Sequence, residues 1–172
     1  LFAKSRGTST GSNTVVQSGD WLGYIAALGA DGTDTDTESS SIRMMVDGTP
    51  GSNDMPGRIE FWTTPDGSAT PSEGMRLDST GRLLIGTTVG WGSNVKLHCS
   101  TSTNTYLVIS GGDSHNTVLA FSDTAATERG AIDYDHNDDS MLFKTAASEA
   151  IRITNAQRVG IGTSTPTNKL DL

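Results

Sequence analysis

The chain has 172 residues, of which 34% are hydrophobic and 6% aromatic, so it has the side chains for a modest apolar core but not for a large one. Its net charge of -8 argues against binding to nucleic acid, whose phosphates would be repelled, and against an anionic membrane surface. The lone cysteine, Cys99, excludes a disulfide within the chain, and we expect it to be a small, partly buried apolar side chain. No apolar stretch approaches the length of a transmembrane helix, so membrane insertion is not expected.

The first half of the chain favours strands separated by turns. The 20 glycines of the whole chain and its abundant Ser and Thr are typical of tight turns and strands, and we find no long run rich in Leu, Glu, Lys and Ala, as a long helix would need. Asp-Gly pairs that begin at Asp31, Asp47 and Asp66 predict turns. Ile59 and Phe61 then alternate with polar neighbours, which is the period of a strand with one apolar face.

Two short hairpins are predicted further along, at residues 75–85 and 151–161. In each, two pairs of alternating apolar residues flank a four-residue turn, residues 78–81 in the first hairpin and residues 154–157 in the second. Ahead of the second hairpin lie two more alternating strands, which contain Ile132, Tyr134, Met141 and Phe143.

The two hairpins belong to an internal repeat. Residues 72–88 align with residues 148–164 at an offset of 76, and Ser, Glu, two Arg, Ile, Gly and Thr are identical at matching positions. Two shorter matches at an offset of 73 relate residues 57–61 to residues 130–134, and Lys96 and Leu97 to Lys169 and Leu170.

This repeat predicts two β modules, residues 1–88 and residues 89–172, with the last residues entering the start of a third repeat. One short hairpin is not stable alone in water, because its apolar face carries only a few side chains. The sequence offers little else to cover these faces, so we expect neighbouring chains to cover them. A closed, rod-like trimer would also hide strand edges that otherwise aggregate.

The expected fold is therefore all-β, with short antiparallel hairpins in repeated modules of an elongated, intertwined homotrimer, built as a β-prism or a triple β-helix. The residues expected at its inter-chain core are Met75, Leu77, Leu83, Ile85, Ile151, Ile153, Val159 and Ile161.

Both copies of the repeat also carry the pattern Glu-x-x-Arg, at Glu73 and Arg76 and at Glu149 and Arg152. Residues three apart along an extended strand point to opposite faces, so we expect no pairing of this Glu and Arg within one strand. We expect each Arg to reach a carboxylate of an adjacent strand or chain and to set the register of the hairpins. The alternative is a solvated charge worth less than about 1 kcal/mol.

Several segments resemble the repeat region of bacteriophage tail fibre proteins. Residues 158–170 carry the pattern R-V-G-I-G-T-x-x-P-x-x-K-L, which in that family often lies just before an intramolecular chaperone domain. Parts of residues 6–33, together with residues 46–61 and 130–152, are similar to other recurring fibre modules, and residues 89–105 match least.

The resemblance implies a homotrimeric virion protein of the tail, made in the host cytoplasm, exposed to the host surface and in contact with other phage tail proteins. No chaperone domain is present in the sequence, so it was either removed or never part of the chain. Leu1, in place of a starting methionine, suggests that translation begins upstream.

Acidic residues offer two candidate metal sites. Asp34 and Asp36 lie in an acidic loop, where closely spaced carboxylates are calcium ligands by type, but the order of an EF-hand loop is missing. His136 lies among the aspartates of residues 133–139, whose place between two strands is that of a hairpin turn. We therefore expect solvated loops, no metal and no cofactor.

The sequence contains neither a G-x-S-x-G nucleophile elbow nor an H-E-x-x-H zinc motif, and it has few apolar residues with which to line a catalytic pocket. We expect no catalytic residues and no enzymatic activity. Trp21, Trp62 and Trp91 are candidates for stacking on sugar rings, with Trp62 the best exposed because it falls on the face opposite Ile59 and Phe61. The alternative for these indoles is packing against a neighbouring chain.

Three functions stay open. Even repeats with small loops favour a structural segment of a tail fibre that extends or presents the host-recognition apparatus on the virion. A binding module for a host-surface glycan or protein is the second. The third is the non-catalytic stem of a polysaccharide-degrading tailspike.

Overall fold

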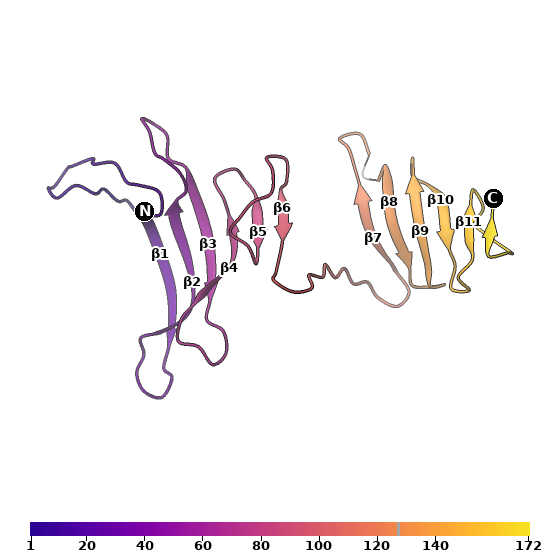
Figure 1. Ribbon diagram of the computed structural model, residues 1–172, viewed down its shortest axis with the longest axis horizontal. Helices are drawn as coiled ribbons and strands as arrows, with labels where there is room; N and C mark the ends of the chain where they lie inside the picture. The colour runs from indigo at the N-terminus through magenta and orange to yellow at the C-terminus, as the bar shows by residue number, and fades with distance from the viewer. Residues whose placement is uncertain (127) are drawn as a thin grey trace. The chain divides into compact units, whose positions relative to one another are not determined.

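The computed structural model describes residues 1–126 and 128–172 of the chain. The fold is all-β, as expected, and its described residues contain no helix, and so none long and apolar enough to span a membrane. The chain divides into two compact units, Leu1–Thr105 and Tyr106–Leu172, which we call unit 1 and unit 2. Each unit is built on one six-stranded sheet (Figure 1).

The sheet of unit 1 follows the order of the chain, so that each strand pairs with the next one along the sequence. Its strands are β1 (Trp21–Gly29), β2 (Thr37–Val46), β3 (Gly57–Thr63), β4 (Ser72–Leu77), β5 (Leu83–Ile85) and β6 (Leu97–Cys99). All pairs are antiparallel except β5 with β6, which is parallel. β1 and β2 are the longest strands, and the loop between them extends past the ends of β4, β5 and β6 (Figure 1).

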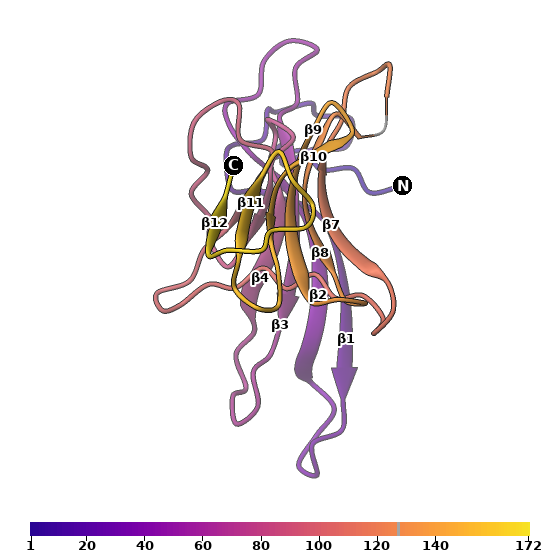
Figure 2. The same ribbon diagram turned by 90° about the vertical axis from the view of Figure 1, so that its right-hand side faces the viewer.

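The sheet of unit 2 repeats this topology, again with one parallel pair at its end. Its strands are β7 (Asn116–Phe121), β8 (Gly130–Asp135), β9 (Ser140–Thr145), β10 (Ser148–Ile153), β11 (Val159–Ile161) and β12 (Leu170–Asp171). Within each sheet the strands lie side by side in a single twisted layer (Figures 1 and 2). Strand by strand, β1 to β6 therefore correspond to β7 to β12.

The two predicted hairpins are confirmed as β4–β5 and β10–β11, and their turns are built alike. In the first, the amide of Asp78 donates to the carbonyl of Arg82 and the amide of Gly81 donates to the carbonyl of Asp78. Thr154 and Gln157 make the equivalent bonds in the second turn. Gly81 and Gln157 both have positive φ, +72° and +56°, so the same left-handed position is filled by glycine in one repeat and by glutamine in the other.

The boundary expected after residue 88 is misplaced. β6 lies beyond it in the sequence but pairs with β5, so unit 1 continues to Thr105. The similarity of Lys96 and Leu97 to Lys169 and Leu170 marks the sixth strand of each sheet rather than the start of the following repeat. The last strand, β12, thus corresponds to β6 and belongs to unit 2.

The match of residues 57–61 to residues 130–134 also relates strands that do not correspond. The first segment is β3, which pairs with β4, whereas the second is β8, which lies one strand further from the equivalent β10. A strand with glycine, a central isoleucine and an acidic residue fits either position, because both strands have one apolar and one polar face.

Candidate functional site

One face of each sheet is apolar. Residues that pair directly across neighbouring strands share a face of the sheet, as does every second residue along a strand. In unit 1, two rows of apolar side chains share one face: Met44, Ile59, Leu77, Leu83 and Leu97 in the first row, and Ile25, Ile42, Phe61, Met75 and Ile85 in the second. We call these residues the apolar face of unit 1.

Unit 2 has a matching surface. Its rows are Leu119, Ile132, Phe143, Ile151 and Ile161, and Tyr134, Met141, Ile153, Val159 and Leu170, which we call the apolar face of unit 2. The residues expected at an inter-chain core all lie on these two faces, as directly opposed pairs: Met75 and Ile85, Leu77 and Leu83, Ile151 and Ile161, and Ile153 and Val159. Their burial by a neighbouring chain stays a prediction.

Both apolar faces are only half covered by their own chain. The larger exposed side chains on them keep 37–57% of their surface accessible: Ile25, Ile59, Phe61, Leu77, Ile85, Leu97, Leu119, Ile132, Phe143, Ile153, Ile161 and Leu170. An antiparallel sheet usually packs its apolar face against a second layer. Here each unit, over its described residues, has one sheet only. Cys99, which the sequence led us to expect partly buried, is exposed too, because it lies on the terminal strand β6 opposite Ile85.

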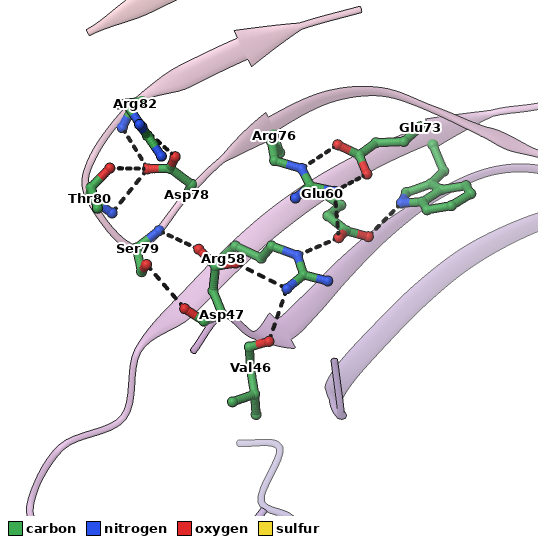
Figure 3. A network of polar contacts seen from close by, with 11 residues as sticks. Val46, Asp47, Arg58, Glu60, Glu73, Arg76, Asp78, Ser79, Thr80 and Arg82 are labelled. Carbon is green, nitrogen blue, oxygen red and sulfur yellow. Dashed lines mark hydrogen bonds and ion pairs between the residues drawn. The ribbon is translucent and has the colours of Figure 1, made fainter. Parts of the chain in front are cut away.

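The opposite face of unit 1 is polar, and it is the better buried of the two. Its centre is Glu60 on β3, whose side chain is 2% exposed. Glu60 accepts hydrogen bonds from Arg58 Nε at 2.5 Å and from Trp62 Nε1 at 2.8 Å. Arg76 Nη2, from the neighbouring β4, lies 3.3 Å from the same carboxylate (Figure 3). A buried carboxylate is tolerated here because every one of these contacts is a charge-assisted or polar hydrogen bond.

A second set of contacts ties this network to the turn between β4 and β5. Asp47, just after β2, accepts from Arg58 Nη1 at 3.1 Å and from the amide of Ser79 at 2.9 Å (Figure 3). Burial by itself would raise the pKa of Asp47, but the hydrogen bonds from Ser79 and Arg58 outweigh it and lower that pKa. The turn is thereby held against a loop 32 residues earlier in the chain.

Asp78 closes the same turn from inside. Its carboxylate accepts from the amides of Thr80 and Arg82, both at 3.0 Å, and from Arg82 Nε at 2.7 Å. Burial would raise the pKa of Asp78, yet these hydrogen bonds prevail and hold it at about 2. Asp78 therefore stays ionised in the folded chain at any ordinary pH.

The expectation that Glu and Arg of the Glu-x-x-Arg pattern cannot pair within a strand is wrong. Arg76 Nε donates to Glu73 Oε1 at 2.5 Å, and Arg152 Nη2 donates to Glu149 Oε2 at 2.7 Å. The reason is a β-bulge in each strand: Trp62 pairs with Glu73 while Phe61 pairs with Met75, which leaves Gly74 as an extra residue. The extra residue returns Glu73 to the face that carries Arg76.

Unit 2 contains the same device, with Ala150 as the extra residue between Glu149 and Ile151. Hydrogen bonds to Glu149 raise the pKa of Arg152, as those to Glu73 raise that of Arg76. As expected, each Arg also reaches past its own strand: Arg76 contacts Glu60 on β3, and Arg152 Nη1 donates to Ser140 Oγ on β9 at 3.1 Å and to Asp138 at 3.0 Å.

The polar face of unit 2 is centred on Asp133 of β8, which is completely buried. Lys144 Nζ, on the adjacent β9, lies 2.5 Å from its carboxylate, and Asn116 Nδ2, on β7, donates to it at 2.9 Å. The hydrogen bond to Asp133 raises the pKa of Lys144. Both units thus bury a carboxylate on the polar face and leave the apolar face half exposed.

An aromatic cluster on the polar face distinguishes unit 1 from unit 2. The guanidinium carbon of Arg43 lies 3.8, 4.9 and 5.8 Å from the ring centroids of Trp62, Trp21 and Tyr24, respectively. Arg43 Nη2 also donates to Glu38 Oε1 at 3.1 Å. The hydroxyl of Tyr24 donates to Glu38 as well, and this bond raises the pKa of Tyr24.

Trp62 is not the best exposed indole of the three. It lies on the face opposite Ile59 and Phe61, as predicted, but Arg43 covers its ring and Glu60 holds its N–H, so it is half buried within its own chain. Trp21 and Tyr24 are 43% and 39% exposed. The sequence alone gave no sign of Tyr24 or Arg43, because their meeting depends on the pairing register of β1, β2 and β3.

The candidate metal ligands are used in local hydrogen bonds. Asp31 Oδ1 accepts from the amides of Thr33 and Asp34, and Asp34 Oδ1 accepts from the amide of Asp36, so these carboxylates stabilise their own loop. His136 Nε2 lies 2.9 Å from Thr117 Oγ1. Among the described residues, no group of three or more His, Cys, Asp or Glu side chains is arranged to hold a metal ion.

No family model matches the sequence, and no curated protein matches it either. Among solved structures, the chain is similar to the carboxy-terminal domain of the bacteriophage T5 L-shaped tail fibre, with a TM-score of 0.48 at 11% identity over 98% of this chain and 88% of that one. That domain together with its intramolecular chaperone domain gives a TM-score of 0.42 at 11% identity, over 98% of this chain and 63% of that one. Both neighbours are tail fibre domains, and a likeness at this level carries no argument about site or activity.

Proposed function

We propose that the chain is a structural segment of a phage tail fibre, which associates with further copies of itself through its apolar faces and extends or presents the host-recognition apparatus on the virion. The observation that carries this proposal is that, in both sheets, the polar face is better buried than the apolar face. Each sheet buries a charged network on one face and leaves its apolar face half exposed. The tail fibre context rests on the sequence pattern of residues 158–170 and of the other fibre-like segments.

The free energy gained by burying the apolar faces is comparable to the free energy that association costs. Complete burial of a large apolar side chain contributes about 1.5–3 kcal/mol, so completing the burial of one that is half exposed contributes about 1 kcal/mol. Over the half-exposed side chains of both units the gain is on the order of 10 kcal/mol per chain. Association costs roughly 4–15 kcal/mol in lost translational and rotational freedom, so contact through both faces offsets a cost of this order.

We propose a trimer as the assembled state, in keeping with the resemblance and with the need to hide strand edges. Sedimentation equilibrium should give the mass of three copies of the 18.0 kDa chain. Ile85→Asp and Ile161→Asp should each prevent assembly, because each places a charge in an apolar contact at a cost of several kcal/mol. Val89→Asp is the matched control, since Val89 is 66% exposed and lies outside both sheets.

Two results would contradict this proposal. A well-folded monomer of the unaltered chain would remove the proposed self-association. Full assembly with unchanged melting in both aspartate variants would show that Ile85 and Ile161 do not face the contact.

A second candidate function is glycan binding, and the aromatic cluster of unit 1 favours it. Trp21 and Tyr24 are 43% and 39% exposed, and partly exposed aromatic rings of this kind can stack on the apolar face of a neutral sugar ring. Saturation-transfer NMR with methyl glycosides of glucose, galactose and mannose tests it. Trp21→Ala should abolish the transfer and Trp91→Ala, at an exposed indole remote in sequence from the cluster, should not. Equal loss in both variants, or no transfer at all, would contradict glycan binding.

The third candidate, the stem of a tailspike, shares the absence of catalysis with the first. We propose that the chain has no hydrolase activity, because its carboxylates are used as structural acceptors at Glu60, Asp78 and Asp133. Incubation with purified bacterial surface polysaccharides should release no oligosaccharide. Release by this chain alone would overturn the non-enzymatic assignment.

A further inference from the structure

Four consecutive apolar residues stand exposed between β6 and β7. The exposed fractions are 79% for Tyr106, 73% for Leu107, 77% for Val108 and 47% for Ile109. Tyr, Val and Ile are among the strongest strand formers, and turn residues, Ser110, Gly111 and Gly112, follow at once. By local sequence these residues form a strand, yet the single chain leaves them outside every strand.

Three residues of this run, Leu107, Val108 and Ile109, also have unpaired backbone groups within the described structure. No backbone hydrogen bond joins Leu107, Val108 or Ile109 to another residue in the part of the chain that the structure describes. β6 and β7, the nearest strands in the sequence, lie at ends of their sheets and could each accept a further strand, but neither pairs with the run. A strong strand former outside a strand is a conflict between local preference and the fold of the isolated chain.

The order of the residues indicates what resolves the conflict. Neighbouring side chains of a strand point to opposite faces, so an uninterrupted apolar run fits a strand that is covered on both faces. A strand covered in this way must also pair its amides and carbonyls, because buried unpaired groups are costly. One sheet edge supplies the pairing, and apolar surface on either side supplies the cover.

The absence of charged residues around this run indicates that a second copy of the chain supplies both the sheet edge and the apolar cover. Residues 97–112 contain no Asp, Glu, Lys or Arg, although 19% of the chain is charged and the net charge is -8. Identical chains can therefore approach along this stretch without like-charge repulsion. Each copy also carries the two half-exposed apolar faces and the unpaired outer edges of β1, β6, β7 and β12.

We propose that residues 106–109 become a β-strand only on assembly, adding to a sheet edge of a second copy of this chain and packing against the apolar faces of the assembled chains. This inference rests on the proposed self-association and goes beyond it, because it assigns an inter-chain contact to a segment outside both apolar faces. This inter-chain strand, residues 106–109, which we call the tie, would link neighbouring chains through backbone hydrogen bonds.

Hydrogen–deuterium exchange with peptide-level mass spectrometry tests the proposal. In the assembled protein, the amides of Leu107, Val108 and Ile109 should exchange at least about tenfold more slowly than in the assembly-deficient Ile161→Asp variant. The β3 and β9 amides report in the same experiment that both sheets remain folded. Equal, fast exchange in the two samples would overturn the proposal, and equal protection in both would show pairing within one chain and overturn it too.

A pair of variants gives an independent measurement. Val108→Asp should raise the chain concentration at half assembly by about tenfold or more, because the tie would then bury a charge. Val89→Asp, at a similarly exposed valine, should leave that concentration unchanged. A monomeric unaltered chain would defeat the proposed self-association itself, whereas a trimer in which Val108→Asp assembles like Val89→Asp would defeat the tie alone.

Discussion

Replacing Glu60 should be among the most damaging single changes in unit 1. Its carboxylate is 2% exposed and accepts from Arg58, Arg76 and Trp62. Glu60→Ala leaves two guanidinium groups, each 13% exposed, without their shared partner, and leaves the indole N–H unsatisfied. Breaking a buried ion pair by removing one partner costs about 3–5 kcal/mol. Because Arg58 keeps Asp47 and Arg76 keeps Glu73, we expect a loss at the lower end of this range, about 3 kcal/mol in the free energy of unfolding, measured by urea denaturation at a fixed chain concentration.

The exposed pair of Asp123 and Arg129 provides the control. Its side chains are 51% and 55% exposed, so Asp123→Ala should cost less than about 1 kcal/mol. Glu60→Gln should fall between the two, because the amide oxygen can still accept from Trp62 while the charge is lost. A cost for Glu60→Ala no greater than that for Asp123→Ala would refute the claim that the buried network stabilises the polar face.

Three further results are expected. Gly86 and Gly162 occupy equivalent positions in the two units, with φ of +71° and +74°. A Cβ added to Gly86 would lie 2.3 Å from the carbonyl oxygen of Ser100, whereas a Cβ added to Gly162 would meet nothing within 4 Å. Gly86→Ala should therefore lower the melting temperature clearly more than Gly162→Ala. Asp78 has a pKa of about 2 in the folded chain, below the value near 3.9 of an unfolded chain. Its ionised carboxylate therefore contributes roughly 2 kcal/mol to the free energy of unfolding above about pH 4, and this contribution is lost as the pH falls through about 2. In Asp78→Asn, urea denaturation should show a weaker loss of stability between about pH 4 and about pH 2 than in the unaltered chain. Gln157→Gly should stabilise unit 2 by about 0.5–1 kcal/mol, because Gln157 holds a positive φ where the first repeat has glycine, and an unchanged or lower melting temperature would contradict this.

The sequence was sufficient for the features that depend on local pattern. The period of two placed Met75 and Leu77 on one face, and the repeat at an offset of 76 related two hairpins whose turns prove to be built alike. The bulge at Gly74 could not be foreseen, because an extra residue in a strand appears only when the partner strand is known. One inserted residue then reverses the face of Glu73 and with it the predicted pairing of Arg76.

The candidate sites also differ in whether the sequence pattern of a single strand is enough to predict them. The apolar faces followed from alternation along each strand, whereas the network around Glu60 and the cluster around Arg43 join residues of several strands. Such contacts depend on pairing register, which short strands with similar patterns leave open. The confusion of β3 with β8 in the weaker repeat has the same origin.

The meander topology of the two sheets has a consequence for how the chain reaches its final state. Every strand pairs only with the strands before and after it in the sequence, so the contacts that build a sheet have limited sequence separations, 24 residues for the pair of Trp21 and Met45 at the ends of β1 and β2. Chains rich in such short-range contacts fold fast, because little loop-closure entropy is lost before contacts form. We therefore expect each sheet to form in a rapid first-order step, followed by a slower phase whose rate rises with protein concentration as chains encounter one another. Stopped-flow refolding at several concentrations, monitored by far-ultraviolet circular dichroism and by the fluorescence of ANS, a dye that binds exposed apolar surface, would separate the two phases, and the loss of ANS fluorescence in the slow one would report the time at which the apolar faces are lost from solvent.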